Sequence, residues 1–284
     1  MGYAFGANTW IWVSPATDER LAELAPQVAV MGFDLIELPV ETPGDWDPDR
    51  TAELLGGLGL GATVCVAMGP DRDLVSADRA TVASTQAYLR ACIDAEATLG
   101  GSVVAGPIYA PVGRTGHLDA GERATLVDRL VESLRPLADY AGERGVRLAV
   151  EPLNRFETSL LNTAAQVMEV VERVDSPACG VLLDTFHMNV EEKRLDAAIR
   201  EVGARLVHLH ACGTDRGTPG EDHIDWPAIA AALTDIGYGG AVVIESFTGE
   251  NRTIATAASI WRPLATSQDA IAADGLAFLR GALG

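Results

Sequence analysis

The sequence has few positive charges. It carries 21 Lys and Arg residues against 40 Asp and Glu residues, which gives a formal net charge of −19 at pH 7. Such a surplus of negative charge repels phosphate backbones and anionic lipid surfaces at long range. We therefore expect neither nucleic acid nor a membrane as a partner, and we interpret the acidity as a source of solubility.

Long apolar runs and flexible linkers are missing as well. No apolar run approaches the ~20 residues that a membrane-spanning helix needs, and the first residues do not form a basic and apolar leader. These absences predict a cytoplasmic location. Because no stretch rich in Pro, Gly or Ser divides the chain, we expect residues 1–284 to form one domain, as α/β barrels of ~250 residues commonly do.

The sequence has four cysteines and no CxxC pair: Cys65, Cys92, Cys179 and Cys212. Three of them lie in or beside apolar runs that are expected to be buried strands. The composition, with 48% apolar and 21% charged residues, is that of a globular protein with a sizeable core. We therefore expect each cysteine to be a free, buried thiol.

Short apolar runs alternate with longer amphipathic ones, which is typical of repeated βα units and a parallel sheet. Strands are predicted at residues 4–9, 35–39, 62–68, 102–106, 147–151, 180–184, 206–210 and 241–245. Apolar residues three and four apart predict helices at residues 18–30, 77–99, 120–143, 163–174, 227–236 and 271–283, and a further helix that starts at Asp47 and Pro48. Strands apolar on both faces are buried on both sides, and a closed barrel achieves this without sheet edges. We predict an α/β fold made of a single (β/α)8 TIM barrel.

Irregular segments are predicted between these elements, at residues 39–47, 69–77, 107–118, 188–195, 213–226 and 248–266. All but part of the last directly follow predicted strands. In a barrel such loops gather at the carboxyl-terminal face, where active sites lie.

Four predicted strands end on side chains that can bind a metal, namely Glu151, Asp184, His210 and Glu245. They are separated by about one βα unit each, so a barrel directs all of them into one mouth. Taken singly, each is equally well explained as a helix cap or a surface salt bridge. Taken together, buried carboxylates are best explained by a cation. Three oxygen donors and one imidazole suit octahedral Mn²⁺, Mg²⁺ or Co²⁺ better than a closed structural zinc site.

The same residue types favour proton transfer. A glutamate that binds metal through one oxygen can act as a base through the other. The strands that carry Glu151 and Glu245 approach the site from opposite sides, so the two carboxylates could work on opposite faces of one carbon. Inversion of a stereocentre requires that arrangement, whereas a single base would serve only if the intermediate turned over.

Longer motifs surround these residues: VEPLNRFETSLLNT from Val150, GVLLDTFHMNVEEK from Gly180, HLHACGTDRGTPGEDHIDW from His208, then VVIESF and ASIWRPLA, and in the first half WVSP, GPDRDL and GPIYAPVGR. Together they closely resemble the ketose 3-epimerases, the family of D-tagatose, D-allulose (psicose) and L-ribulose 3-epimerases within the xylose-isomerase-like TIM-barrel superfamily. The resemblance covers nearly the whole chain. It implies a metal-dependent epimerisation of free ketoses at C3, through a cis-enediolate, in a homodimer or homotetramer.

The resemblance also assigns roles by position. It places the family's metal ligands on the four residues already chosen from strand ends, with Mn²⁺ as the expected ion, and its catalytic pair on Glu151 and Glu245. It places substrate contacts on Glu157, near the O1 and O2 end of the sugar, and on His187 and Arg216, which would hydrogen-bond oxygens that gain charge. Without the motif these three would be interpreted as a loop carboxylate, a core histidine and a solvated charge.

An apolar wall of the pocket is implied at Trp12, Cys65 and Ile108, which composition alone would assign to the core. Glu37 ends a predicted strand and is expected either to face the same mouth or to form a structural salt bridge. His208 points into the barrel, like His210 two residues later, and is expected to be a packing or supporting residue and not a ligand.

One segment departs from the family. Where relatives usually carry a glycine-rich turn before HIDW, this chain has GEDHIDW, and Glu221 and Asp222 add two negative charges. The departure affects the conformation of that loop and the selectivity for the sugar, but not the metal site. His223 is expected to fix the loop through a hydrogen bond.

Four other functions share some of these sequence features. An aldose–ketose isomerase could use the same metal and glutamates if the sugar shifted by one carbon. A nuclease similar to endonuclease IV shares the DTxH segment, but it needs further histidines where the third and fourth strands end, near Met68 and Gly106, and it would not suit the net charge. A silent sugar-binding module would not need both glutamates. A phosphorylated substrate would need a glycine-rich anion site, and Gly213, Arg216 and Arg252 are present without a compact glycine nest. A neutral sugar is favoured, and the two arginines leave a phosphorylated one open.

Overall fold

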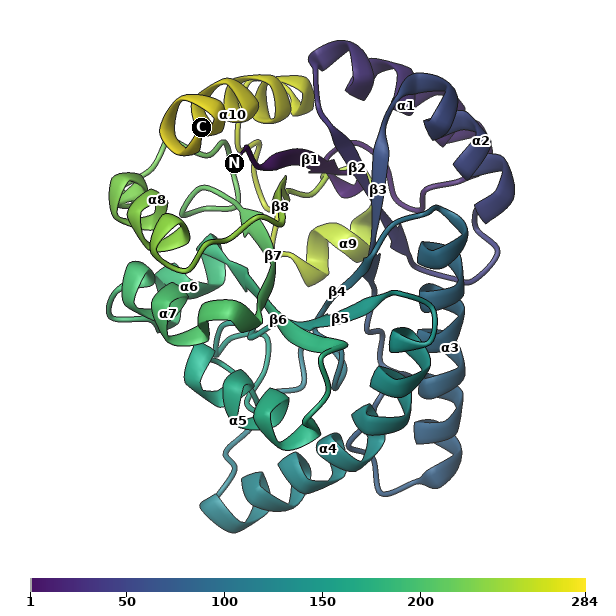
Figure 1. Ribbon diagram of the computed structural model, residues 1–284, viewed down its shortest axis with the longest axis vertical. Coiled ribbons are helices and arrows are strands. Elements are labelled where there is room, and N and C mark those ends of the chain that lie inside the picture. Colours follow the sequence, from purple (N-terminus) through teal and green to yellow (C-terminus); the bar gives the residue numbers. More distant parts are fainter. Residues whose placement is uncertain (1) are drawn as a thin grey trace.

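The computed structural model describes residues 2–284. Eight parallel strands pair in sequence order and close into a barrel, because β8 pairs with β1. Figure 1 shows the barrel inside a ring of helices. The strands are β1 (Ala4–Asn8), β2 (Leu35–Val40), β3 (Gly61–Val66), β4 (Val103–Gly106), β5 (Arg147–Val150), β6 (Cys179–Asp184), β7 (Leu206–Ala211) and β8 (Ala241–Ile244). The predicted (β/α)8 barrel is confirmed.

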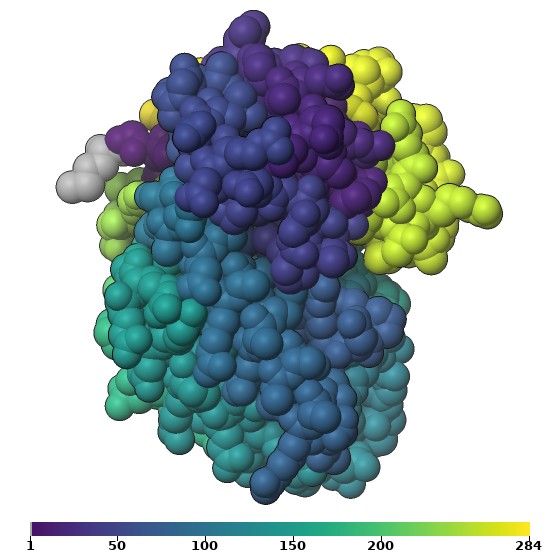
Figure 2. Space-filling view, turned by 90° about the vertical axis from the view of Figure 1, so that its right-hand side faces the viewer, coloured from purple at the N-terminus to yellow at the C-terminus, as the bar shows by residue number. Residues whose placement is uncertain are grey.

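The helices follow the strands in alternation. They are α1 (Asp18–Met31), α2 (Pro48–Leu58), α3 (Arg79–Thr98), α4 (Ala120–Gly142), α5 (Ala164–Val174), α6 (Thr185–Glu191), α7 (Leu195–Val202), α8 (Trp226–Asp235), α9 (Arg252–Ala257) and α10 (Gln268–Leu283), with 3-10 turns η1 (Thr9–Ile11) and η2 (Gly203–Arg205). Figure 2 shows the side of the molecule on which the purple and blue atoms of the first third of the chain form a continuous surface. Within residues 2–284, no helix combines the length and the apolar character that crossing a membrane requires.

The strand ends differ from the prediction by one or two residues, for local reasons. β5 and β8 stop one residue before Glu151 and Glu245. In β5 the next residue is Pro152, which has no N–H to continue a ladder. β3 stops at Val66 and not at Met68, because the Ala67 N–H donates to the Tyr88 hydroxyl at 2.8 Å instead of to a neighbouring strand.

Two segments predicted to be irregular contain short helices. α6 occupies much of residues 188–195, and α9 lies within 248–266. Both are capped by a side chain: Asp184 accepts from the N–H groups of Phe186 and His187, and Asn251 accepts from Thr253. The prediction was wrong here because helices of seven and six residues offer too few apolar positions to show a period.

The core confirms the expectation for the cysteines, all four of which are free and buried. One large apolar cluster fills the space between strands and helices, and a smaller one of Val103, Ala105, Ala149, Leu182 and Val207 lies apart from it. Several polar side chains at or next to strand ends are buried, among them Glu151, Asp184, His210 and Glu245.

A buried carboxyl on α3 holds the start of β4. Glu96 is 0% exposed, and its Oε1 accepts the Val103 N–H at 2.8 Å. Its Oε2 has no hydrogen-bond partner among residues 2–284. Burial raises the pKa of Glu96 to about 8, so the folded protein keeps this carboxyl protonated at neutral pH.

We expect the wild type to lose stability relative to the Glu96→Gln variant as the pH rises from 5 to 8. As the pH rises above the ordinary value of 4.5, the unfolded chain releases this proton first, while the folded chain holds it until about pH 8. The free energy of unfolding of the wild type therefore falls relative to the variant, by about 3 kcal/mol between pH 5 and pH 8. Urea unfolding of both proteins at the two pH values measures this, and parallel pH profiles would contradict it.

Candidate active site

Four polar side chains meet at the carboxyl-terminal end of the barrel, each at or next to the end of a different strand: Glu151 after β5, Asp184 at the end of β6, His210 near the end of β7, and Glu245 after β8. We call them the carboxylate–histidine cluster. One possible ligand atom of each lies within 4.8 Å of those of the others. None of the four residues is more than 5% exposed. The structure thus brings together the four residues that the strand ends indicate.

Two acids of this cluster, Glu151 and Asp184, have raised pKa values. Burial and then the charge of Glu245 raise the pKa of Glu151 well above its usual 4.5, and the same two causes raise the pKa of Asp184 to about 6. Burial opposes the charged form of His210, but the carboxylates of Glu37 and Glu245 outweigh it and raise the pKa of this imidazole. A cation placed among these carboxylates would relieve their repulsion.

Two atoms in the cluster are buried without a hydrogen-bond partner in residues 2–284, Glu151 Oε1 and His210 Nδ1. Orphaned polar atoms of this kind destabilise a folded protein. A carboxylate oxygen and an imidazole nitrogen are, however, ordinary metal ligands. The orphaned atoms and the donor set of three carboxylates and one imidazole therefore fit a divalent metal ion.

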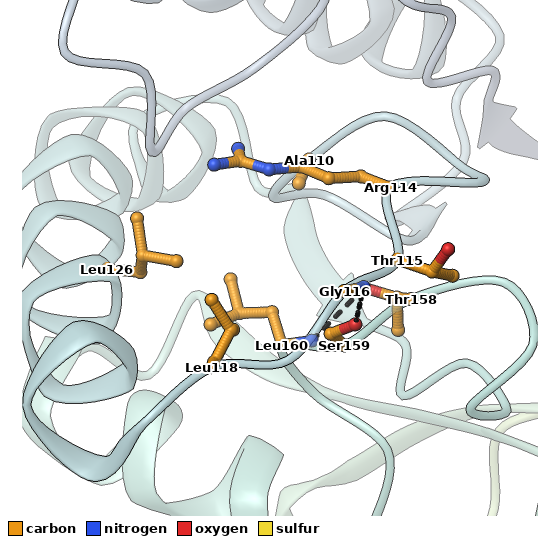
Figure 3. A pocket seen from close by; sticks show the side chains of 9 residues that line it. All are labelled: Ala110, Arg114, Thr115, Gly116, Leu118, Leu126, Thr158, Ser159 and Leu160. Atoms are coloured by element: carbon orange, nitrogen blue, oxygen red, sulfur yellow. Dashed lines mark hydrogen bonds between the residues drawn. The ribbon is translucent and has the colours of Figure 1, made fainter.

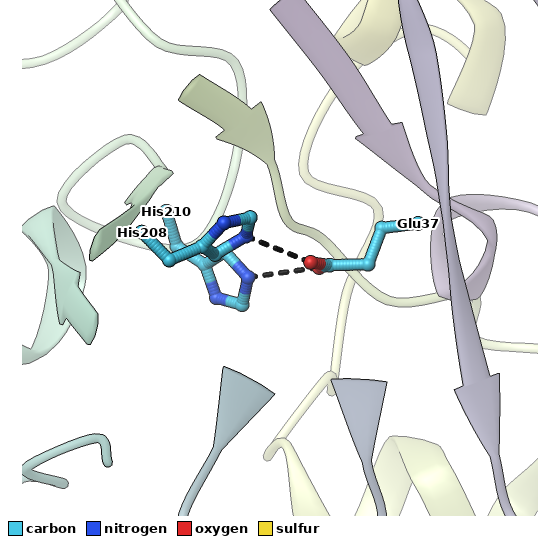
Figure 4. A group of neighbouring side chains, drawn as sticks. All are labelled: Glu37, His208 and His210. Atoms are coloured by element: carbon cyan, nitrogen blue, oxygen red, sulfur yellow. Dashed lines mark hydrogen bonds and ion pairs between the residues drawn. The ribbon is translucent and has the colours of Figure 1, made fainter. Parts of the chain in front are cut away.

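His210 has its two ring nitrogens in different surroundings. Nδ1 lies 3.8 Å from Asp184 Oδ2 and 3.6 Å from Glu245 Oε1, inside the cluster. Nε2 lies 2.8 Å from Glu37 Oε1, on the opposite side of the ring. His208 also approaches this carboxylate, with 2.8 Å between Nε2 and Glu37 Oε2 (Figure 4). Glu37 lies within β2, which continues to Val40, and does not end the strand as the sequence suggested.

His187 is fixed by the loop after β5. It lies on α6, is 2% exposed, and accepts the Asn154 N–H on Nδ1 at 3.0 Å. An imidazole that accepts on Nδ1 carries its proton on Nε2, and burial lowers the pKa of His187 well below 6.5, so the ring is neutral. Nε2 lies 3.7 Å from Glu151 Oε1. His187 therefore presents a neutral N–H donor beside the cluster.

Arg216 and Glu157 form a pair next to the cluster. Arg216 Nη2 lies 2.6 Å from Glu157 Oε1, and Nη1 lies 3.9 Å from Glu245 Oε2. The guanidinium is 4% exposed and lies 4.3 Å from the ring centre of Phe186 and 5.0 Å from that of Phe247. Burial opposes its charge, but Glu157 and Glu245 raise its pKa, so it stays positive. Arg216 has a φ of 67°, a strained value for a residue with a side chain.

The loop that carries Glu157 is joined to the loop after β4. The Gly113 N–H donates to the Glu157 carbonyl at 2.7 Å, and the Ser159 N–H donates to the Arg114 carbonyl at 3.2 Å. Gly116 N–H donates to Ser159 Oγ at 2.7 Å, at the edge of a hollow between the two loops (Figure 3). That hollow contains no residue of the carboxylate–histidine cluster. These hydrogen bonds fix the backbone from which Glu157 reaches Arg216.

The three residues expected to form an apolar wall lie at different depths. Cys65 is 2% exposed; burial raises its pKa, as do the nearby charges of Glu37 and Glu245, which places it close to the cluster. Ile108 is fully buried in the loop after β4. Trp12 is only partly buried, and its Nε1 donates to Asp269 Oδ1 on α10 at 2.7 Å.

Two aromatic residues not expected from the sequence line this region. Trp10 and Phe247 pack with Cys65 and Ala258, and their ring centres lie 5.4 Å apart. Trp10 lies in the 3-10 turn that follows β1, and Phe247 lies two residues after Glu245. Their position just after predicted strand ends was the feature of the sequence that could have indicated a place in this region.

Asn154 is the clearest polar residue that the sequence reasoning missed. It is 2% exposed, and besides its N–H bond to His187 its Nδ2 donates to Glu157 Oε1 at 2.9 Å. It thereby connects two of the expected substrate contacts. Its position three residues after Glu151, inside the VEPLNRFETS motif, was the available signal.

The loop before α8 is closed by Asp222. This residue accepts from the N–H groups of Gly220 at 2.9 Å and Ile224 at 2.8 Å, and from Trp226 Nε1 at 3.1 Å. The fixing role predicted for His223 is thus carried out by its neighbour. Glu221 is exposed, so only one of the two additional acids has a structural role.

A barrel with a buried cluster of carboxylates and a histidine that could hold a metal ion at its mouth is typical of a class of enzyme. Residues 26–282 match the family model described as "Xylose isomerase-like TIM barrel". This match covers most of the chain, which therefore belongs to the xylose isomerase-like TIM barrel family.

Individual relatives narrow the class to the ketose 3-epimerases. The chain is 35% identical over 278 residues to a probable ketose 3-epimerase of Synechocystis sp., covering 97% of this chain and 95% of the relative. It is 34% identical over 276 residues to an L-ribulose 3-epimerase of Mesorhizobium japonicum, with coverage of 96% and 92%. A solved L-ribulose 3-epimerase structure matches with a TM-score of 0.93 at 34% identity, covering 99% of this chain and 95% of the other. The resemblance seen in the sequence is confirmed, and the chain is an isomerase of the epimerase class.

Proposed function

We propose that this enzyme epimerises free ketoses at C3, and that the carboxylate–histidine cluster holds a divalent metal ion for this reaction. The observation that carries the proposal is the cluster itself, with its orphaned Glu151 Oε1 and His210 Nδ1. The relatives named as ketose 3-epimerases support the reaction class. When bound, a divalent ion at this position supplies a Lewis acid that polarises the sugar's carbonyl group and acidifies the neighbouring C–H.

Glu151 and Glu245 are the proposed acid/base pair. Inversion at C3 requires one group to remove a proton from one face and another to return a proton to the other face. The two glutamates follow β5 and β8, which are not neighbours in the barrel and so approach the site from different sides. Their buried position raises the pKa of Glu151 and favours proton exchange with a weakly acidic carbon.

His187 and Arg216 are the proposed donors to the oxygens that become negative as the cis-enediolate forms. His187 is held as the Nε2–H tautomer by the Asn154 N–H. Arg216 is held by Glu157, and both donors are in place before the sugar binds, which lowers the reorganisation needed in the transition state. Glu157 is the proposed contact for the O1 and O2 end of the ketose.

Further features of the proposal concern the pocket, the ion and the assembly. Trp12, Cys65 and Ile108 are the proposed apolar wall, with Trp10 and Phe247 added on the basis of their packing around Cys65. We propose Mn²⁺ as the ion, with Co²⁺ or Mg²⁺ as substitutes, because all three accept oxygen-rich octahedral sites. The proposed substrates are neutral ketoses such as D-fructose, D-tagatose or L-ribulose, and the proposed assembly is a cytoplasmic homodimer or homotetramer of one-domain chains.

Isotope exchange tests the position of the reacting carbon. The enzyme is incubated with D-fructose and Mn²⁺ in deuterated water, and products are analysed by NMR. We expect deuterium at C3 in the D-allulose formed. One carboxylate removes the proton from C3, and the second carboxyl group, whose own proton has exchanged with the solvent, delivers deuterium to the other face. Glu250→Gln, which changes an exposed glutamate after β8, serves as a matched control and should behave as the wild type.

The opposite labelling pattern would contradict the proposal. Deuterium at C1 together with an aldose product would show that the sugar binds one carbon further along and that the enzyme is an aldose–ketose isomerase. A panel of free ketoses, compared by kcat/KM for each pair of C3 epimers, then identifies the preferred sugar.

A further inference from the structure

Glu37 lies inside the barrel, where it forms three hydrogen bonds and has a fourth polar group, His208 Nε2, nearby. It is 0% exposed. Asn8 Nδ2 donates to Oε1 at 2.9 Å, and Thr63 Oγ1 donates to Oε2 at 3.0 Å. The imidazoles of His208 and His210 approach one oxygen each, both at 2.8 Å (Figure 4). These partners come from β1, β3 and β7, so the carboxylate connects three strands besides its own.

This arrangement determines which nitrogen of His210 carries a proton. An ionised carboxylate only accepts hydrogen bonds, so His210 Nε2, at 2.8 Å from Oε1, must be the donor. A histidine binds a metal ion as the neutral ring, and with the proton held on Nε2 the lone pair for the ion lies on Nδ1. Nδ1 is the orphaned atom that lies 3.6 Å from Glu245 Oε1 and 3.8 Å from Asp184 Oδ2.

We propose that Glu37 is a positioning residue of the metal site, which holds His210 as the Nε2–H tautomer and so directs the Nδ1 lone pair at the bound ion. The inference rests on the proposed function, because it requires a metal in the carboxylate–histidine cluster. A hydrogen bond from the distal nitrogen of a ligating histidine to a carboxylate fixes the ring and increases its basicity. Glu37 itself does not touch the ion.

His208 and Thr63 complete this device. Thr63 Oγ1 donates to Oε2, and His208 Nε2 lies 2.8 Å from the same oxygen without forming a hydrogen bond, whereas Oε1 is bonded to His210 and Asn8. The carboxylate is thus held at both oxygens. His208 contacts Glu37 and is not one of the four residues of the carboxylate–histidine cluster.

A different interpretation is a second metal site, because one ligand-capable atom each of Glu37, His208 and His210 lies within 4.8 Å of the others. The hydrogen bonds argue against it. Oε1 of Glu37 already forms hydrogen bonds with Asn8 and His210, and Oε2 accepts from Thr63, at 2.8 to 3.0 Å, so a cation would have to displace these partners. A carboxylate with hydrogen bonds to both oxygens is satisfied without an ion.

The experiment compares Mn²⁺ affinity in the whole enzyme by isothermal titration. Glu37→Gln keeps the size of the side chain but places an N–H group where an acceptor is needed. We expect its Kd for Mn²⁺ to rise by about 10- to 100-fold. Thr63→Val, which keeps the shape and removes one donor to Glu37, should give a smaller loss in the same direction and keeps the test valid if Glu37→Gln does not fold.

Glu96→Gln is the matched control, because Glu96 is an equally buried glutamate of the same barrel that contacts no cluster residue. Its Kd should equal that of the wild type, and circular dichroism of each metal-free variant confirms that it is folded. If folded Glu37→Gln and Thr63→Val bind Mn²⁺ as tightly as the wild type, the role of Glu37 is overturned while the metal site stands. If the wild type itself does not bind one ion per chain, both the inference and the proposed metal site are overturned.

Discussion

Glu245→Gln is expected to lower kcat for C3 epimerisation by about 10²- to 10⁴-fold, and Glu151→Gln is expected to do the same. Each substitution removes one of the two groups that we propose exchange a proton with C3. An amide cannot take or return that proton, although it keeps the size of the side chain. The rate is measured with saturating Mn²⁺, so that weaker metal binding does not account for the loss.

The two variants should also differ from each other in a specific way. In Glu245→Gln, Glu151 still removes a proton from the epimer whose C3–H faces it, so that epimer exchanges with deuterated water without inverting. In Glu151→Gln the other epimer exchanges. NMR of both sugars of a pair, incubated separately with each variant, measures this, and exchange of the same epimer by both variants would show that one carboxylate serves both faces.

The control for these variants is Glu250→Gln, whose side chain is exposed in the loop after β8. It changes the same residue type near the same strand without altering the cluster. Elemental analysis of each protein should show one ion per chain. Epimerisation at the wild-type rate by either cluster variant with full metal content would exclude the proposed pair.

Removal of the metal ion should abolish epimerisation and lower the midpoint of thermal unfolding. Burial and the charge of Glu245 raise the pKa of Glu151 and of Asp184, which shows how unfavourable the shared burial of these acids is without a cation. An ion at 100 times its Kd stabilises the folded state by about 2.7 kcal/mol, which corresponds to about 5 °C for a chain of this size. Dialysis against a chelator, followed by activity assays and calorimetry, measures both effects.

Restoration distinguishes loss of the ion from damage to the protein. Added Mn²⁺ or Co²⁺ should return both the activity and the unfolding midpoint, whereas NaCl at equal ionic strength should return neither. Full activity in enzyme that contains less than a few hundredths of an ion per chain would rule out the metal-dependent mechanism.

The sequence predicted the cluster because its information is local. Each of Glu151, Asp184 and Glu245 follows a short apolar run, and parallel strands bring such ends to one face of a barrel. The register of the strands was not needed for this prediction, so errors of one or two residues at strand ends did not affect it. The same logic located His210, although β7 continues one residue beyond it.

The supporting residues could not be predicted in the same way, because their roles depend on contacts between distant strands. Glu37 on β2 meets its histidine partners only because β7 faces β2 across the barrel. The sequence does not show this, so it left two interpretations of Glu37 equally open: a residue that faces the mouth, and one that forms a structural salt bridge. Asn154 acts through the backbone N–H it offers to His187, 33 residues away. Trp10, and not Trp12, packs beside Cys65. Trp10 lies in a short 3-10 turn, and a turn of three residues has no periodicity from which its side-chain directions could be predicted.

The hydrogen bonds between residues 107–118 and the loop after β5 have a consequence for enzyme engineering. Glu157 is supported from Gly113, and Ser159 from Arg114, so neither loop has an independent conformation. Recombination with a relative that exchanges one loop alone would combine a sugar contact with a foreign support. The two segments form one structural unit. Recombination that aims to change the sugar preference therefore has to exchange both of them together.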